Sequence, residues 1–210
     1  MKKGFLTILC FYIFVVSLYA QEENYIQEKD IAYYSDLVNK ADAYIAERCK
    51  LDVYYPKDTT NVATIVWFHG GGITAGNKHI PEGLLEQKII VVAVNYRLYP
   101  KVKQPEYIKD AADAVAWTFN NIEKYNGRRN AIYISGHSAG GYLASMVGMD
   151  KSYLKAHDID ANDIAGLFRL ADTPLLILRC EKSRVSKVRS QQSTNTRPCS
   201  MFEKMHHQYF

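Results

Sequence analysis

The fold is constrained most strongly by three short, largely apolar segments, which are separated by loops and by one long amphipathic stretch. These segments are rich in β-branched residues and cover residues 63–68, 89–94 and 131–135. Runs of this kind, without polar alternation, are typical of strands that are buried on both faces of a parallel sheet. Because the strands alternate with helical patterns, the sequence predicts an α/β fold with a mostly parallel sheet and helices on both faces.

Helices are predicted in three places. Apolar residues recur every three or four positions from Ile108 to Tyr125, which predicts a helix that ends near Gly127. A shorter helix is predicted over residues 81–88, and an apolar helix follows the third strand as far as Met149. The length of 210 residues fits a single domain. Further strand candidates cover residues 29–34, 48–55 and 173–178.

A G-x-S-x-G pattern, Gly136 to Gly140, lies between the strand over residues 131–135 and the apolar helix. In this context the pattern predicts a sharp strand-to-helix turn that exposes the hydroxyl of Ser138 above the sheet. The turn brings the two flanking glycines close together, where a Cβ would clash. The start of the following helix favours negative charge, so we expect the Ala139 N–H to stabilise an oxyanion.

A second glycine-rich loop, His69-Gly-Gly-Gly72, directly follows the strand over residues 63–68. Consecutive glycines let bare backbone approach a substrate oxygen, so the N–H groups of Gly71 and Gly72 are the expected partners of Ala139 in an oxyanion hole. A phosphate-binding loop is the alternative, but the required lysine and glycine spacing are absent. We expect His69 to fix the loop rather than to act as a base.

Four blocks of sequence then resemble, in order and spacing, the H-G-G-G carboxylesterases of the α/β-hydrolase superfamily. The blocks are Leu51–Pro56, Val66–Gly72, Val94–Leu98 and Gly136–Gly141. The similarity covers residues 30–178 and looks closest to bacterial secreted esterases related to feruloyl and acetyl-xylan esterases, with kynurenine formamidase as a cousin.

The resemblance implies a serine mechanism. Carboxylic esters would be hydrolysed through an acyl intermediate on Ser138, with Gly71, Gly72 and Ala139 as the oxyanion donors and without a metal or cofactor. Small-molecule or polysaccharide-linked esters are the implied substrates.

The acid and the base of such a mechanism are not identified by the sequence. They should follow the serine as Asp or Glu and then His. After residues 173–178, where the family carries its acid, this chain offers only Glu181 as a weak candidate. His157 comes before that strand, which leaves His206 and His207 as weak candidates for the base.

The C-terminal segment, residues 179–210, differs in character from the rest. It holds seven basic and two acidic residues and has no buried-strand pattern. We therefore expect an incomplete hydrolase domain over residues 21–178, lacking the last strand or strands, followed by a basic polar tail that is foreign to the fold. The alternative to an active esterase is a catalytically impaired hydrolase-fold binding protein or a truncated fragment.

The N-terminus predicts a cleaved signal peptide over residues 1–20. Lys2 and Lys3 precede an apolar run from Phe5 to Leu18, which is shorter than the roughly 20 residues of a membrane-spanning helix. A secreted or periplasmic protein without a stable membrane anchor is therefore expected.

The charge and the cysteines of the mature chain suggest no further partner. With 24 basic and 22 acidic residues, the chain gives no indication of nucleic-acid binding. Cys49, Cys180 and Cys199 do not form a metal-site pattern, and they leave open one disulfide with one free thiol.

Overall fold

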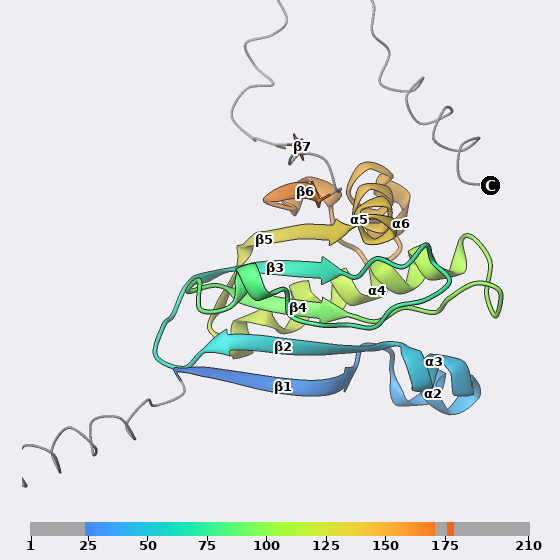
Figure 1. The fold of residues 1–210 in the computed structure, drawn as a ribbon, viewed down its shortest axis with the longest axis horizontal. Helices are drawn as coiled ribbons and strands as arrows, with labels where there is room; N and C mark the ends of the chain where they lie inside the picture. The colour runs from blue at the N-terminus through green and yellow to red at the C-terminus, as the bar shows by residue number, and fades with distance from the viewer. Residues whose placement is uncertain (1–23, 171–175, 179–210) are drawn as a thin grey trace, which may run out of the picture. The chain divides into compact units, whose positions relative to one another are not determined.

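The strands of the protein form one mixed sheet in the computed structural model, which describes residues 24–170 and 176–178 (Figure 1). The strand order is β1-β2-β4-β3-β5-β6-β7. Strands β4, β3, β5 and β6 are parallel, whereas β1, β2 and β7 pair antiparallel with their neighbours. The predicted α/β class with a mostly parallel sheet is confirmed. The strands are β1 (Tyr25–Ala32), β2 (Lys50–Pro56), β3 (Val62–Phe68), β4 (Ile90–Val94), β5 (Gly127–His137), β6 (Gly166–Leu170) and β7 (Leu176–Leu178).

The helices differ from the predicted ones mainly where they are short. The helix predicted over residues 81–88 is wrong, because only a 3-10 turn, η1 (Glu82–Leu84), forms there. Two six-residue helices before β2 were not predicted, since they are too short to show a hydrophobic period. Within the described ranges, no helix is both long and apolar enough to cross a bilayer. The helices are α2 (Asp36–Ala41), α3 (Ala43–Arg48), α4 (Glu106–Asn121), α5 (Ala139–Met149) and α6 (Lys151–Lys155), with 3-10 turns η2 (Ile122–Tyr125) and η3 (Ala161–Asp163).

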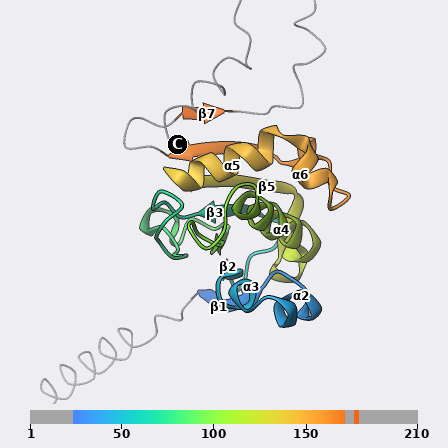
Figure 2. The ribbon, with the colours of Figure 1, turned by 90° about the vertical axis from the view of Figure 1, so that its right-hand side faces the viewer.

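The main hydrophobic core lies between the sheet and the helices α4 and α5. Alternate residues of the central strands, such as Val66 and Val92, point into it and are fully buried. On the other face of the same strands, Trp67 is buried near the ring of His79, at a centroid distance of 6.4 Å. The segment between β3 and β4, which contains η1, thus covers this second face, opposite α4 (Figures 1 and 2).

Both glycine-rich loops start at the same edge of the sheet. Phe68, the last residue of β3, lies opposite Gly136 of β5 and opposite Val94 of β4. Figure 2 looks onto this edge from the carboxyl ends of the parallel strands. The parallel register therefore places the predicted site residues side by side, as expected for an α/β sheet.

Several sequence-based expectations lie outside the described residues. Cys49 is buried and forms no disulfide within the part of the chain that the structure describes. Outside that part lie the signal peptide over residues 1–20, the tail over residues 179–210, Cys180 and Cys199.

Candidate active site

Ser138 occupies a strained turn between β5 and α5. Its backbone angles are φ 52° and ψ −115°, a region that a non-glycine residue adopts only when its surroundings enforce it. The surroundings here leave no room for larger neighbours: a Cβ at Gly136 would overlap the carbonyl group of Gly140, and a Cβ at Gly140 would overlap the carbonyl oxygen of Phe68. The serine itself is exposed. The turn thus has the form that the G-x-S-x-G pattern predicts.

Replacing Gly140 with alanine is expected to destabilise the protein by about 2 kcal/mol, because backbone must move to admit the new Cβ. This cost outweighs the gain of about 1 kcal/mol that alanine offers over glycine inside a helix. Gly83 provides a matched control, since a Cβ there would meet no atom within 4 Å. Chemical unfolding of both variants measures the difference. Equal stability of Gly140→Ala and Gly83→Ala would contradict the close contact between the turn that carries Ser138 and β3.

The loop after β3, residues 69–80, is called the glycine loop below. Its first carbonyl groups point back into the loop: the ring Nδ1 of His69 lies 2.6 Å from the Gly70 oxygen, and the Gly71 oxygen accepts hydrogen bonds from the N–H groups of Thr74 and Ala75, at 3.1 and 3.0 Å. In a planar trans peptide the N–H points away from the carbonyl. The N–H groups of Gly71 and Gly72 are therefore directed away from these internal partners.

Glycine is required in this stretch for its backbone conformation. Gly71 and Gly72 have φ values of 113° and 61°, which residues with a side chain rarely adopt. Within the described residues, the N–H groups of Gly71, Gly72 and Ala139 donate no backbone hydrogen bond. All three are therefore available as donors to a bound oxyanion.

The glycine loop lies directly against the serine turn. A Cβ built on Gly70 would be 3.6 Å from the Cβ of Ser138 and 2.9 Å from Nδ1 of His137. The structure therefore brings together all four residues that the sequence predicts for the site, Ser138, Gly71, Gly72 and Ala139, at one edge of the sheet. Their catalytic roles remain predictions.

His69, the first residue of the glycine loop, is held in place by packing and hydrogen bonds. It is 2% exposed and its ring stacks on Tyr96, with ring centroids 4.4 Å apart, while the Tyr96 hydroxyl donates to the His69 carbonyl oxygen at 2.8 Å. Burial lowers the pKa of His69 to about 4, so the ring is neutral at physiological pH. Because its Nδ1 faces the Gly70 oxygen, Nδ1 carries the proton. These contacts agree with a role in fixing the loop.

The low pKa of His69 predicts a loss of stability in mild acid. The unfolded chain binds a proton to this histidine near pH 6.5, whereas the folded chain does so only near pH 4, so folding becomes less favourable as the pH falls through this window. The expected loss is about 3 kcal/mol. Unfolding curves between pH 7 and pH 4 measure it. His69→Gln should lose this contribution, whereas a variant of the exposed His79 should keep it; identical pH dependence in His69→Gln would be inconsistent with a neutral buried ring.

The structure does not bring a catalytic acid or base to Ser138 within the described residues. Glu181, His206 and His207 lie outside them. His157 follows α6, beyond the far end of α5 from Ser138, and its Nε2 lies 3.8 Å from a carboxylate oxygen of Asp113. Burial raises the pKa of that carboxyl group. In the same part of the chain, no group of three or more His, Cys, Asp or Glu side chains could hold a metal ion.

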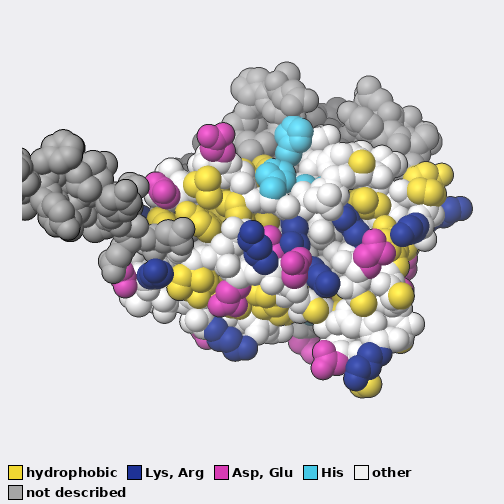
Figure 3. Space-filling model, turned by 60° about the horizontal axis from the view of Figure 1, so that its bottom comes forward, with side chains coloured by type: hydrophobic (Ala, Val, Ile, Leu, Met, Phe, Trp, Pro, Cys, Tyr) yellow, Lys and Arg dark blue, Asp and Glu magenta, His cyan; other side chains and the backbone are white. Residues whose placement is uncertain are grey.

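Sequence reasoning missed the residues that anchor the glycine loop. The Lys78 ammonium pairs with Asp52 at 2.7 Å and with Asp30 at 2.9 Å. The backbone N–H of Lys78 donates to the side-chain oxygen of Asn95 at 2.6 Å. On the face shown in Figure 3, basic and acidic side chains likewise lie among one another, and histidine side chains gather beside them. Only the position of Asn95 and Tyr96, directly after β4 at the edge of the site, could have indicated a role in the site.

Comparison with known proteins places these features in a family. A family model described as BD-FAE matches residues 51–167. A probable isoprenylcysteine alpha-carbonyl methylesterase of Oryza sativa subsp. japonica is 29% identical over 160 residues, which cover 73% of this chain and 36% of that protein. Esterase LipC of Mycobacterium tuberculosis is 32% identical over 106 residues, which cover 47% and 26% of the two chains. The chain therefore spans only about a quarter to a third of the curated relatives it matches.

Solved structures show the same fold. A truncated form of a carbohydrate esterase from gut microbiota is 27% identical with a TM-score of 0.51, and the match covers 60% of this chain and 45% of that one. Esterase B from Lactobacillus rhamnosis, at 23% identity and a TM-score of 0.53, covers 76% of this chain and 53% of its own and shows the likeness of fold. Because the family model covers more than half of the sequence, the chain belongs to the BD-FAE family, and its fold is that of the α/β hydrolases.

Proposed function

We propose that the protein is a serine hydrolase that cleaves carboxylic esters. The observation that carries the proposal is the exposed Ser138 on its strained turn, in contact with the glycine loop, where the N–H groups of Gly71 and Gly72 donate no backbone hydrogen bond within the described residues. An exposed hydroxyl beside free amide donors is the arrangement that acyl transfer requires. The relatives named above are esterases, which supports the same reaction class.

The proposed reaction has two steps. Ser138 Oγ attacks the ester carbonyl carbon, its proton passes to a histidine base, and the negative charge on the carbonyl oxygen is stabilised by the N–H groups of Gly71, Gly72 and Ala139. Collapse of this intermediate expels the alcohol with a proton from the base and leaves an acyl-serine. Water then attacks the acyl group and releases the carboxylic acid. His206 and His207 are the candidate bases, and Glu181 is the candidate acid.

For the substrate we propose small-molecule or polysaccharide-linked esters, handled outside the cytoplasm after removal of the signal peptide. The similarity to a structure named as a carbohydrate esterase supports the polysaccharide-linked class. The experiment is a comparison of p-nitrophenyl esters of increasing acyl length with methyl ferulate and acetylated xylan. Release of acetate or ferulate supports the proposal. Cleavage of none of these esters by the full chain would contradict it.

A second candidate is a hydrolase-fold binding protein without turnover. The observation that favours it is the position of His157, the described histidine after Ser138, which pairs with Asp113 instead of approaching the serine. Calorimetry with xylo-oligosaccharides separates the two candidates. Saturable binding without release of any acid or alcohol would favour the binding protein.

A further inference from the structure

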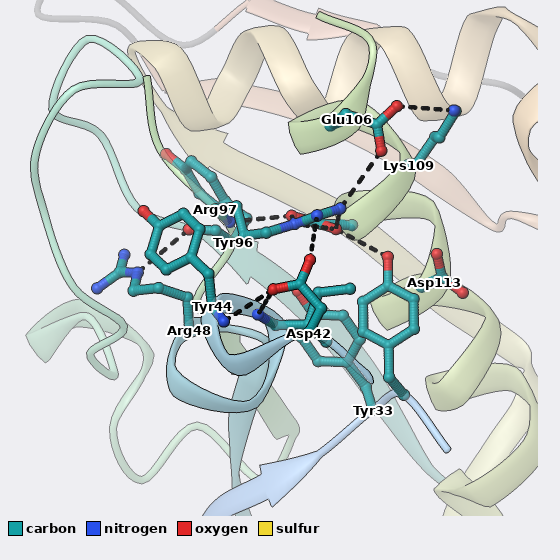
Figure 4. Close-up of polar contacts among 12 residues, drawn as sticks. Tyr33, Asp42, Tyr44, Arg48, Tyr96, Arg97, Glu106, Lys109 and Asp113 are labelled. Atoms are coloured by element: carbon teal, nitrogen blue, oxygen red, sulfur yellow. Dashed lines mark hydrogen bonds and ion pairs between the residues drawn. The ribbon is translucent and has the colours of Figure 1, made fainter. Parts of the chain in front are cut away.

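The guanidinium group of Arg48, at the end of α3, hydrogen-bonds to two segments: the glycine loop and the segment that follows β4. Its Nε donates to the carbonyl oxygen of Tyr96 at 3.3 Å. Its Nη1 and Nη2 donate to the Asn77 side-chain oxygen at 2.6 Å and to the Gly76 carbonyl oxygen at 3.1 Å. Figure 4 shows Arg48 reaching toward Tyr96. One planar group therefore links the far part of the glycine loop to the segment that follows β4.

The contacts of Arg48 lead to the serine through close backbone packing. A Cβ on Gly76 would overlap Nδ1 of His69 and lie 2.5 Å from the Gly70 oxygen, so Gly76 fits tightly against the start of the glycine loop. Gly70 in turn lies against Ser138. A shift of Gly76 would therefore displace the residues next to Ser138, because a close-packed interior transmits such movements.

The second support, Tyr96, is held by the same guanidinium. Tyr96 stacks on His69 and donates a hydrogen bond to its carbonyl oxygen. Arg48 thus hydrogen-bonds to both of the residues, Tyr96 and Gly76, that enclose His69. Removal of Arg48 would break both of these links at once.

The described acceptors of the Arg48 guanidinium are all uncharged: two backbone carbonyl oxygens and an asparagine side chain. Arg97 pairs with Asp110 and Lys78 pairs with Asp52, but in the described part of the chain Arg48 forms no ion pair. The positive charge of Arg48 also acts on the residues around the loop. Burial is the main reason for the low pKa of His69, and the charge of Arg48 lowers this pKa further. The same charge opposes the rise in the pKa of Tyr96 that burial causes. A cation at this place favours the development of negative charge at the loop.

We propose that Arg48 is a positioning residue that holds the glycine loop in the conformation in which the N–H groups of Gly71 and Gly72 meet an oxyanion. The role in catalysis rests on the proposed function, whereas the role in holding the loop does not. The guanidinium is suited to it because its planar donors reach acceptors on two segments in a fixed geometry, whereas a lysine ammonium is a compact charge on a flexible stem.

The first test is hydrogen exchange of the full chain, which needs no activity. Arg48→Met is expected to raise the exchange rate of the Thr74 and Ala75 amides, which donate to the Gly71 oxygen, about 10-fold, as the loss of the Arg48 hydrogen bonds lets the loop open. Lys101→Met is the matched control, because Lys101 is an exposed cation that lies over the Tyr44 ring and pairs with Glu47, both outside the loop. Arg48→Lys should give an intermediate rate. Loop exchange in Arg48→Met equal to that of the control would overturn the proposal.

The second test separates positioning from substrate binding. Arg48→Met should lower kcat for p-nitrophenyl acetate about 10- to 100-fold with little change in KM, because displaced donors weaken only the transition state. A raised KM at unchanged kcat would show that Arg48 binds substrate and would overturn the positioning role. If the unaltered chain neither hydrolyses esters nor is labelled at Ser138, the proposed function fails, and the exchange experiment still decides whether Arg48 holds the loop.

Discussion

Replacing Ser138 with alanine is expected to lower kcat for ester hydrolysis by about 10⁴- to 10⁶-fold, to the level that binding and the oxyanion donors alone support. The loss is this large because the hydroxyl oxygen forms the covalent bond to the acyl group, and the turn from Gly136 to Gly140 carries no second hydroxyl group. Release of p-nitrophenol from its acetate, followed at saturating substrate, measures the effect.

Ser152 gives the control for this substitution. It is exposed at the start of α6 and its hydroxyl is bonded to Asp150 at 2.6 Å, away from the glycine loop. Ser152→Ala should hydrolyse esters at the rate of the unaltered chain. Activity of Ser138→Ala within a few-fold of this control would remove the assignment of the nucleophile.

The largest stability effect is expected at Asp110, whose carboxylate is fully buried. It accepts hydrogen bonds from the Arg97 guanidinium at 2.8 and 2.9 Å, from the Arg97 N–H at 3.0 Å and from the Tyr34 hydroxyl at 2.7 Å. Figure 4 shows Arg97 at the centre of this network. Asp110→Asn leaves a guanidinium that is only 9% exposed without its main counter-ion, which is expected to cost about 3–5 kcal/mol.

Glu106 is the matched control, since it faces the same guanidinium from the surface. Its side chain is 40% exposed and its carboxylate lies 3.5 Å from Arg97, so Glu106→Gln should cost less than about 1 kcal/mol. Denaturant unfolding of the two variants measures the difference. Equal stability of both variants would mean that the buried pair does not hold α4 to the segment after β4.

The parts of the fold that the sequence predicts well are those with long or largely apolar patterns. The strand predicted over residues 63–68 is β3, which ends at Phe68 as predicted and begins one residue earlier. The helix predicted from Ile108 runs from Glu106 to Asn121 and continues as the turn η2. In these elements the hydrophobic pattern and the burial in the structure have the same physical cause. The helix expected over residues 81–88 failed because a few apolar residues in a short polar segment do not specify a helix.

The site was predictable only where its chemistry follows a local pattern. Ser138 and the glycines of both loops belong to short motifs in which steric requirements fix the residue type at each position. Arg48 and the two carboxylates that pair with Lys78, Asp30 and Asp52, come from separate segments and meet the glycine loop only in the folded chain. The acid and base could not be found for the same reason, since triad partners are defined by geometry and not by spacing.

Whether Ser138 is the nucleophile is tested most directly by covalent labelling of the full chain with a fluorophosphonate, followed by intact-mass analysis and peptide mapping. This reagent reacts with a serine whose hydroxyl is activated and exposed, and the phosphonyl oxygen then occupies the place of the oxyanion. If Ser138 is the nucleophile, we expect one adduct per chain, located on Ser138 and absent from Ser138→Ala. An adduct on another residue, or equal labelling of the alanine variant, would contradict it.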